Sequence, residues 1–386
     1  DYSDIFTEST LRYAGKPTDV QVVAGSQPNF VTISWEAPAD NGGSTITDYV
    51  ITIKRSIDTW DNYFDSFWVG SDDTSYTDYE YLNSGTSYDF RIQGYNGDYG
   101  LESDMVTYIT PEGPTHHITT CQELQEMNEI FDENWSATAA KIILDNDIDC
   151  SETREWNDDG DYYLGFMPLY YFEGIFDGQG YAIKNLYINR PEDGNVGLFE
   201  SLGDATFQNL KLADNEINGY EYVGMLAGNA DEGTVTFTNI DMSGGAITGY
   251  EEIGGLIGTV YDSYMIVSDS SIDVSIEGDY NIGGLAGYLD ESDIEIEYTT
   301  VSGSILGSSD LGGMVGYSND EFSCDMCSST VDITGVTEYE GDQSYSIGGL
   351  IGSADEVYIE NSSNSGNLIG DYRIGGLVGY LDDESS

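Results

Sequence analysis

The chain of 386 residues carries 71 Asp and Glu against 11 Lys and Arg, a formal net charge of −60 at pH 7. Contacts to phosphate need clustered Lys and Arg, so this balance argues against binding to nucleic acid or to an anionic membrane. The hydrophobic content of 39% and the regular patterning argue against disorder, and the self-repulsion must be screened by salt or by bound divalent cations.

The first fifteen residues, Asp1–Gly15, form a polar segment without an initiating Met or a signal peptide, which we interpret as the start of a mature or excised form. Two interpretations of this segment stay open. It can be a disordered tail, or an extended strand that adds to a sheet edge of a neighbouring subunit. On the second interpretation its assembly residues are Ile5, Phe6, Leu11 and Tyr13.

Residues 16–110 contain short runs in which apolar and polar residues alternate, separated by turn clusters such as Ala39–Gly43. The clearest runs are Val31–Trp35, Tyr49–Ile53 and Tyr88–Ile92. Alternation of period two at this spacing predicts a β-sandwich.

The same residues resemble a fibronectin type III domain. Lys16-Pro17 opens the domain, Trp35 stands in an early core strand, and Leu82–Tyr88 leads into Phe90. The resemblance implies a spacer or an adhesive module. The loop after Asn96 lacks an Arg-Gly-Asp sequence, so recognition of the integrin type is not expected.

Residues 111–120 are predicted to be a linker, with Pro111, Gly113, Pro114 and the pair His116-His117. Two adjacent histidines could begin a metal site, but the sequence has no other His. We therefore expect a solvated pair in the linker.

The run Cys121–Glu133 has apolar residues at a helical spacing, and we predict a short helix that caps the open core of the next domain. Residues 121–179 are assigned to this cap and to the first coils. Cys121 and Cys150 are candidates for a disulfide, which would contribute ~3 kcal/mol by loop-closure entropy.

A six-residue phrase, Ile-Gly-Gly-Leu-Ile-Gly in its clearest copy, recurs down the second half of the chain. Its first residues are 196, 223, 253, 282, 311, 347 and 374, so the spacings are 27, 30, 29, 29, 36 and 27. A period of this size predicts a solenoid in which each repeat forms one coil of a parallel β-helix. The glycines suit a corner where the backbone approaches backbone closely or adopts a positive φ. Inward ladders are expected from Leu256, Leu285, Met314, Leu350 and Leu377.

The phrase resembles the GLUG repeat, and the resemblance covers about residues 180–386. It implies a secreted or cell-surface protein of bacteria or archaea and a right-handed β-helix, and it implies no single chemistry. The predicted fold class is all-β: a fibronectin type III-like sandwich followed by a right-handed parallel β-helix with a short capping helix.

The spacing of 36 residues is longer than the others, and the additional residues lie around Val336–Ser346. This insertion is either a tolerated surface loop or a binding loop. After the last phrase the chain shows no amphipathic cap. Truncation, a folded-over acidic tail or the stacking of another copy can explain this, and a head-to-tail contact that does not close would build a filament. Its assembly residues would be Leu377, Val378 and Leu381.

Acidic residues recur in pairs at predicted turns, and hard cations bind several oxygens that converge from such loops. The nearest approach to a calcium loop is Asn157–Asp161, with Asp158, Asp159 and Asp161 as candidate ligands, although it lacks the spacing of an EF-hand. Ordered calcium and an acidic coat that attracts ions stay open as alternatives.

Cys324 and Cys327 form an isolated Cys-x-x-Cys within one repeat. A zinc or redox role needs a second pair or a nearby His, so we expect inward burial or a local disulfide. Both cysteine pairs fit a secreted protein.

The sequence offers little support for an enzyme. Catalysis on a β-helix needs acids on successive coils together with a basic residue, whereas the bases are scattered. They are Lys141, Arg154, Lys184, Arg190, Lys211 and Arg373. The 31 tyrosines, several at equivalent turn positions such as Tyr220, Tyr250 and Tyr280, suit sugar stacking, lateral contact between rods or simple stacking of equivalent residues.

The function expected from the sequence is therefore an extracellular structural protein, the subunit of a cell-surface filament, sheath or adhesin, whose main partner is a second copy of itself. The alternative is a surface module that binds glycans, and a polysaccharide-degrading enzyme is the least favoured interpretation. Calcium is the one cofactor considered, and the charge suits a salt-adapted organism.

Overall fold

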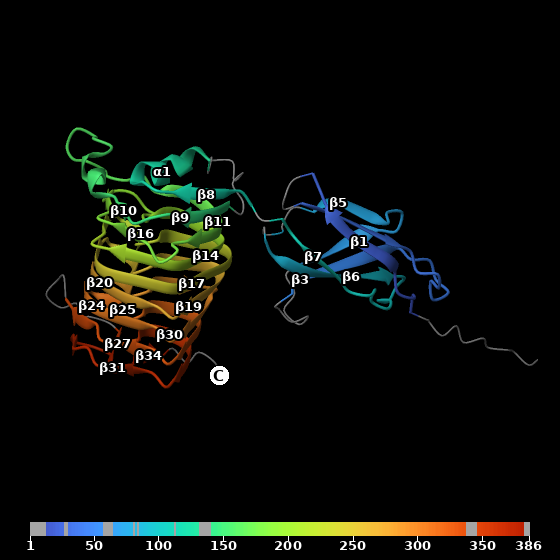
Figure 1. The fold of residues 1–386 in the computed structure, drawn as a ribbon. Coiled ribbons are helices and arrows are strands. Elements are labelled where there is room, and N and C mark those ends of the chain that lie inside the picture. Colours follow the sequence, from blue (N-terminus) through green and yellow to red (C-terminus); the bar gives the residue numbers. More distant parts are fainter. Residues whose placement is uncertain are drawn as a thin grey trace, which may run out of the picture. The chain divides into compact units, whose positions relative to one another are not determined.

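The computed structural model describes residues 13–26, 30–56, 65–79, 82, 85–111, 113–130, 140–336 and 346–381. Ile5, Phe6 and Leu11 lie outside these ranges, as does most of the predicted insertion. The chain divides into two compact units, Asp1–Gly113 and Pro114–Ser386. Figure 1 shows a β-sandwich in the first and a parallel β-solenoid in the second, as the sequence predicted.

The front unit consists of two antiparallel sheets. The three-stranded sheet has the order β1-β2-β5 and the four-stranded sheet the order β4-β3-β6-β7. Their strands are β1 (Thr18–Ala24), β2 (Val31–Glu36), β3 (Asp48–Arg55), β4 (Asp65–Gly70), β5 (Ser75–Tyr79), β6 (Ser87–Tyr95) and β7 (Val106–Ile109).

The core of the sandwich follows the period of two. On β2, Val31, Ile33 and Trp35 are buried while the residues between them are partly exposed. The ring of Trp35 lies 5.2 Å from that of Tyr49 on the facing sheet. Each strand therefore has one apolar face against the other sheet, which closes the sandwich.

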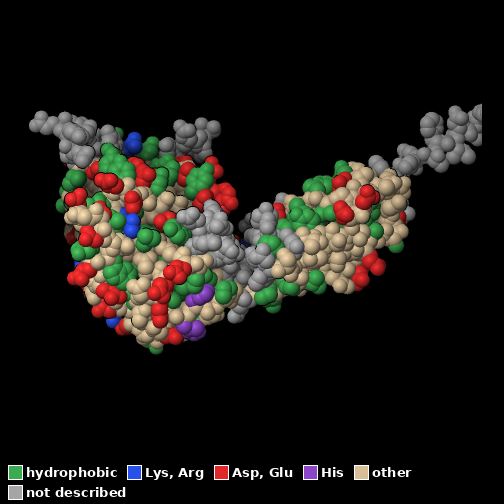
Figure 2. Space-filling view, turned by 90° about the horizontal axis from the view of Figure 1, so that it is seen from above, with side chains coloured by type: hydrophobic (Ala, Val, Ile, Leu, Met, Phe, Trp, Pro, Cys, Tyr) green, Lys and Arg blue, Asp and Glu red, His purple; other side chains and the backbone are tan. Residues whose placement is uncertain are grey.

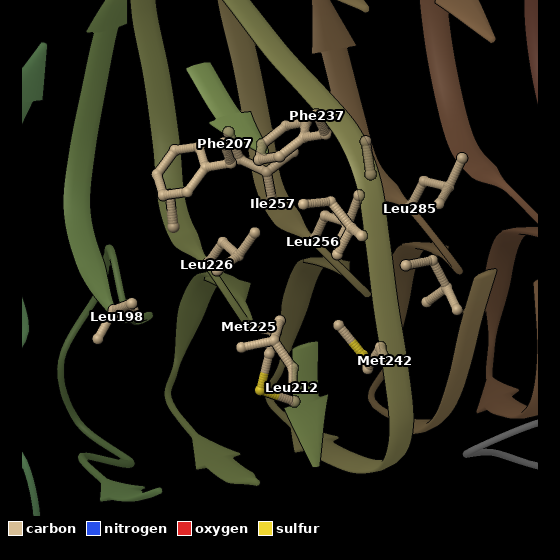
Figure 3. Close-up of a cluster of buried hydrophobic side chains, with 14 of the residues drawn as sticks. Leu198, Phe207, Leu212, Met225, Leu226, Phe237, Met242, Leu256, Ile257 and Leu285 are labelled. Carbon is tan, nitrogen blue, oxygen red and sulfur yellow. The ribbon is translucent and has the colours of Figure 1, made fainter. Parts of the chain in front are cut away.

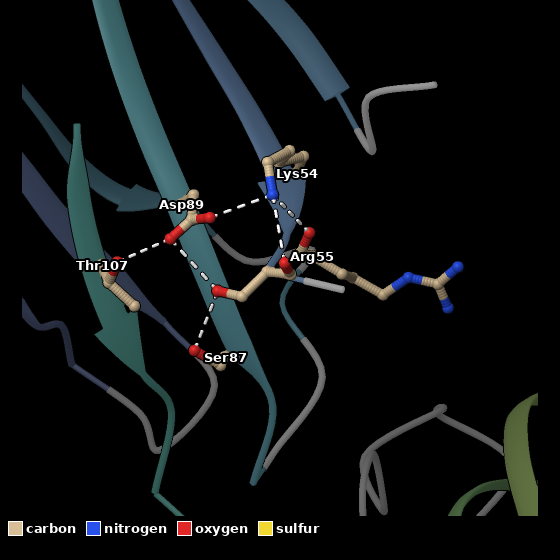
Figure 4. A network of polar contacts seen from close by, with 6 residues as sticks. Lys54, Arg55, Ser87, Asp89 and Thr107 are labelled. Atoms are coloured by element: carbon tan, nitrogen blue, oxygen red, sulfur yellow. Dashed lines mark hydrogen bonds and ion pairs between the residues drawn. The ribbon is translucent and has the colours of Figure 1, made fainter. Parts of the chain in front are cut away.

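A buried ion pair connects β3 and β6 within the four-stranded sheet (Figure 4). Lys54 Nζ lies 2.9 Å from Asp89 Oδ2, and each side chain is only 7% exposed. The hydroxyl of Thr107 donates to Asp89 Oδ1 at 2.6 Å, and that of Ser56 donates to the same atom at 3.1 Å. Burial alone would raise the pKa of Asp89, but these donors and Lys54 outweigh it and lower the pKa.

The predicted linker is partly wrong, because its second half is the first strand of the solenoid. β8 (Thr115–Ile118) pairs in parallel with β9 (Ala140–Leu144), which gives its backbone the partners that a linker lacks. The histidines accordingly stand on a strand. His117 Nδ1 lies 2.9 Å from Asp145 Oδ1, and the buried Nε2 of His116 has no hydrogen-bond partner among the described residues.

The predicted cap exists but its helix is shorter. Helix α1 (Cys121–Glu126) is capped at its N-terminus by the Thr120 hydroxyl and continues as a 3-10 turn, η1 (Met127–Glu129). Leu124 and Met127 are buried over the first coils. Residues 131–139, where the predicted helix ended, lie outside the described ranges. A disulfide joins Cys121 to Cys150.

The solenoid walls are a 21-stranded and a six-stranded sheet, and all pairings between consecutive coils within them are parallel. The six-stranded sheet contains β16 (Glu221–Gly224), β18 (Glu251–Gly254), β21 (Tyr280–Gly283), β25 (Ser309–Gly312), β29 (Ile347–Gly348) and β33 (Ile374–Gly375). The larger sheet begins with β8, β9, β10 (Ile148–Asp149), β11 (Leu169–Asp177), β12 (Ala182–Lys184), β13 (Tyr187–Asn189), β14 (Phe199–Ala213), β15 (Glu216–Asn218) and β17 (Ala227–Thr248). A second 3-10 turn, η2 (Ser151–Glu155), follows β10.

The larger sheet continues to the last described coil. Its remaining strands are β19 (Ile257–Ser268), β20 (Ser271–Glu277), β22 (Ala286–Asp290), β23 (Asp293–Glu297), β24 (Thr300–Gly307), β26 (Val315–Asp325), β27 (Ser328–Ser329), β28 (Asp332–Gly335), β30 (Ile351–Glu360), β31 (Ser363–Asn364), β32 (Leu368–Ile369) and β34 (Val378–Leu381).

The repeated phrase sets the register of the coils. Its first residues pair directly with one another, Val196 with Val223, Val223 with Ile253, and onward to Ile347 with Ile374. The strand register therefore reproduces every spacing of the repeat. The phrase turns the corner between the two sheets, because β18 ends at Gly254 and β19 begins at Ile257.

Close approach explains the paired glycines of the phrase. A Cβ on Gly254 would lie 1.8 Å from the carbonyl oxygen of Ile257, and one on Gly255 would lie 2.0 Å from that of Gly284. Neither residue has a positive φ. The prediction of a tight corner is confirmed. Of the two proposed reasons for glycine, close approach of the backbone applies here and positive φ does not.

Inward side chains fill the coils (Figure 3). Leu198, Leu226, Leu256 and Leu285 stand in successive coils, each at most 1% exposed. From the facing wall Phe207 stacks on Phe237 with ring centroids 5.4 Å apart. The predicted ladder continues through Met314 and Leu350, both fully buried, to Leu377, which is partly buried.

Candidate functional sites

Strand alternation places the acidic side chains outside this filled interior. On β23, Ile294 and Ile296 are buried while Asp293 faces out. On the face shown in Figure 2, Asp and Glu are spread over the solenoid and Lys and Arg are few. The function of this unit must therefore be sought on its outer surface.

The structure does not gather the three candidate calcium ligands around one point. Asp158 accepts the backbone N–H of Gly160, and Asp159 accepts those of Asp161 and Tyr162, so these carboxylates close a local turn. The described part of the chain contains no group of three or more His, Cys, Asp or Glu side chains that could hold a metal ion. Asp158 and Asp159 therefore have a structural role that the sequence analysis did not anticipate.

The candidate assembly residues differ in exposure. Tyr13 is 63% exposed. In the last described coil Leu377 and Val378 pack partly against the core, whereas Leu381 is 50% exposed. Val378 and Leu381 bound β34, which pairs with β30 of the preceding coil.

Cys324 and Cys327 are joined by a disulfide at a corner of the solenoid and are both nearly fully buried. Met326, between them, has a φ of +53°. Both accounts that the sequence left open, inward burial and a local disulfide, apply together.

A column of non-glycine residues with positive φ precedes each copy of the phrase. It contains Asn195, Tyr222, Glu252, Asn281, Asp310, Ser346 and Arg373. Such residues rarely adopt this conformation, so the register of neighbouring coils must hold them in it. Burial, with Glu251 and Glu221 adding to it, raises the pKa of Glu252 to about 7.

Exposed tyrosines stack along one corner, at turn positions recognised in the sequence: Tyr220 and Tyr250 are equivalent, and Tyr280 is in register with Glu251, the next residue. The rings of Tyr220 and Tyr250 lie 5.4 Å apart and nearly parallel, and those of Tyr250 and Tyr280 lie 5.8 Å apart and edge to face. These side chains are 44%, 37% and 38% exposed in that order. The three rings, named here the tyrosine ladder, present aromatic surface to the solvent.

A cleft that sequence analysis did not find opens beside the first copy of the phrase. It is lined by Pro168, Arg190, Glu192, Asp193, Gly194, Asn195, Val196 and Glu200. The Arg190 side chain is 12% exposed and pairs with Asp193 at 3.2 Å. Its Nε and the Asn195 Oδ1 are buried without hydrogen-bond partners among the described residues.

Glu200 stands in this cleft where the later coils carry glycine. The register pairs Phe199 with Ala227 and Ser201 with Asn229, so Glu200 is equivalent to Gly228. A Cβ on Gly228 would lie 2.3 Å from the backbone of Asn195 in the preceding coil. Glu200 has room because the six-stranded sheet starts one coil later, at β16. Burial raises the pKa of its carboxyl group, although Arg190 opposes this.

The comparison with known protein families concerns the front unit. A family model of the fibronectin type III domain matches residues 15–109. The front unit is a fibronectin type III domain. Among solved structures, domains A168–A170 of titin are 29% identical, cover 26% of this chain and 33% of that chain, and have a TM-score of 0.22. A myokine structure is 17% identical, covers 25% and 98%, and has a TM-score of 0.22.

The chain is also similar to halomucin of Haloquadratum walsbyi. The two are 31% identical over 121 residues, which is 31% of this chain and 1% of halomucin. The chain thus spans only a small fraction of this relative. Among the described residues, no helix is long and apolar enough to cross a bilayer.

Proposed function

We propose that the chain is part of an extracellular structural protein of the cell surface, in which the solenoid is a rigid rod and the fibronectin type III domain a spacer. The filled interior carries this proposal, since partners must then meet the outer surface. The similarity to halomucin, the acidic surface and the GLUG resemblance support a surface protein of a salt-adapted organism.

In its finer form, the proposal is a subunit of a filament, sheath or adhesin that assembles through strand addition by Asp1–Gly15 and through end-to-end contacts of solenoids. Ile374 and Leu381 in the last described coil are 45% and 50% exposed, whereas their register partners in the preceding coil, Ile347 and Ala354, are fully buried. A strand ladder continued by a neighbouring molecule would bury them, and each buried side chain of this size contributes about 2 kcal/mol.

Negative-stain electron microscopy tests the assembly. We expect the full chain in high salt to form filaments whose axial repeat is near the length of one subunit. A variant without Asp1–Gly15 should assemble more weakly, because it lacks the added strand. The comparison includes calcium and a chelator, since calcium is a proposed cofactor. Dispersed short rods of the full chain in every condition would contradict the filament model.

Glycan binding is the second candidate function, and the tyrosine ladder favours it. Exposed aromatic rings in a row stack on the apolar faces of sugars. Neighbouring acids such as Glu251 and Asp279 can accept hydrogen bonds from sugar hydroxyls. A glycan array probed in calcium and showing no binding would contradict this candidate.

We propose that the protein is not an enzyme. In the solenoid Arg154, Lys184 and Arg190 each pair with an acid, which fits a role in holding segments together rather than in catalysis. We expect a panel of polysaccharides incubated with the full chain to show neither new reducing ends nor unsaturated products. Release of either product would overturn the assignment.

A further inference from the structure

The cleft beside the first phrase contains both kinds of hydrogen-bonding group without partners. The buried Nε of Arg190 is a donor, and the buried Oδ1 of Asn195 is an acceptor. The half-buried carboxyl group of Glu200 shares this cleft. Polar atoms buried without partners cost free energy, so a ligand that completes their hydrogen bonds would bind favourably there.

The charges of the lining restrict the chemistry of that ligand. Glu192, Asp193 and Glu200 would repel an anion, and the unpartnered Nε–H of Arg190 needs an acceptor, which a cation does not supply. A neutral molecule that both donates and accepts hydrogen bonds fits this set of donors and acceptors best. A hydroxyl group does both. Neutral sugars carry several hydroxyl groups on one ring, so a single sugar unit could reach all three side chains.

The tyrosine ladder begins at the wall of this cleft. The backbone N–H of Tyr220 donates to the carbonyl of Asp193 at 2.8 Å, and that of Tyr250 donates to the carbonyl of Tyr220 at 2.7 Å. Asp193, Tyr220 and Tyr250 thus occupy one column along the solenoid. A chain molecule with one end in the cleft could continue over the exposed rings.

We propose that the cleft binds the terminal unit of a neutral polysaccharide through Arg190, Asn195 and Glu200, and that the following units stack on Tyr220, Tyr250 and Tyr280. This inference rests on the glycan-binding candidate above and gives it a site and a ligand class. Within the described coils the site occurs once, because Glu200 has glycine at the equivalent positions of the later coils, Gly228, Gly258, Gly287, Gly316, Gly352 and Gly379.

Two matched substitutions test the cleft without straining the fold. Asn195 and Asn281 occupy equivalent corners, with φ values of +55° and +51°, so glycine suits both. Asn195→Gly removes a side chain of the cleft, whereas Asn281→Gly removes its counterpart in a later coil. Glu200→Gly gives the first coil the residue that the later coils carry. The thermal unfolding of each variant shows whether it is folded.

The probes are neutral hexasaccharides of glucose, xylose, mannose and N-acetylglucosamine, their disaccharides, and hexagalacturonate as an anion, measured with the full chain by calorimetry. We expect a neutral hexasaccharide to bind, and Asn195→Gly and Glu200→Gly each to weaken it about tenfold, while Asn281→Gly leaves it unchanged. Tyr250→Ser should weaken the hexasaccharide and spare the disaccharide, because only the longer chain reaches that ring.

The other results separate the proposals. Equal affinity of all folded variants would overturn the cleft and leave glycan binding intact. Tighter binding of hexagalacturonate than of every neutral sugar would overturn the ligand class. Absence of binding by all probes would overturn both the cleft and the glycan candidate, whereas the structural function would still be judged from the filaments.

Discussion

Gly313→Ala is expected to destabilise the solenoid by about 3 kcal/mol, because overpacking against backbone cannot be relieved by a rotamer change. A Cβ on Gly313 would lie 2.1 Å from the carbonyl oxygen of Gly349 and 2.3 Å from the Ser329 hydroxyl. The next coil, which contains Gly349, would have to move away, and Ser329 in the same coil would have to shift. The change is measured as a lower urea midpoint and as faster amide exchange in β25 and β29, with the full chain under conditions that keep it dispersed as single molecules.

Gly376→Ala is the matched control. Gly376 holds the same place in the phrase of the last described coil, where an added Cβ would meet nothing within 4 Å. The free energy of unfolding of the Gly376→Ala variant should therefore equal that of the original chain to within a few tenths of a kcal/mol, the usual range for surface substitutions. If the two variants unfold alike, crowding between coils is not the reason for glycine in the phrase.

Asp89→Ala is expected to destabilise the fibronectin type III domain by about 3–5 kcal/mol, the usual effect of leaving a buried charge without its partner. Lys54 would lose the carboxylate at 2.9 Å while staying only 7% exposed. The hydroxyls of Thr107 and Ser56 would lose their acceptor as well. Urea unfolding of the full chain, followed by amide exchange in β3 and β6 of the domain, measures the loss.

The exposed pair Lys16–Asp104 provides the control for Asp89. Its side chains are 44% and 88% exposed, so Asp104→Ala should cost less than about 1 kcal/mol. The pH dependence gives a second check. Because the folded state lowers the pKa of Asp89, the stabilisation is complete above the unfolded pKa, near 4, and is lost as the pH falls through the folded value. A domain whose acid sensitivity is the same with and without Asp89 would contradict this account.

The sequence was sufficient to predict the fold wherever a residue pattern repeats with a fixed period, because each repeat then adopts the same geometry. The spacings between phrases predicted which residues pair, such as Val223 with Ile253 and Ile282 with Leu311. They could do so because equivalent residues of a parallel stack lie in register. The alternation in β2 placed Ile33 and Trp35 in the sandwich core for the same reason. Periodicity is a strong predictor because burial imposes it.

Features that depend on a single contact could not be predicted in this way. Thr115–Ile118 is a strand only because β9 pairs with it, and four residues carry no period. The positive φ of Tyr222 and Glu252 contradicts their intrinsic preference and follows from the coil register. The cleft has one sequence signal that was available: Glu200 interrupts a column of glycines. The equivalence of Glu200 to these glycines can be recognised only when the strand register is known.

The hydrogen bonds between coils run along the solenoid axis, which has a mechanical consequence. Tension applied along that axis through the two ends loads the ladders in series, so the outermost coil should detach first and the others should follow one at a time. A released coil of about 29 residues extends to roughly 100 Å, against ~4.8 Å for the coil in place. The rod would thus lengthen under load in discrete steps. Each step would absorb mechanical energy as the hydrogen bonds of one coil break.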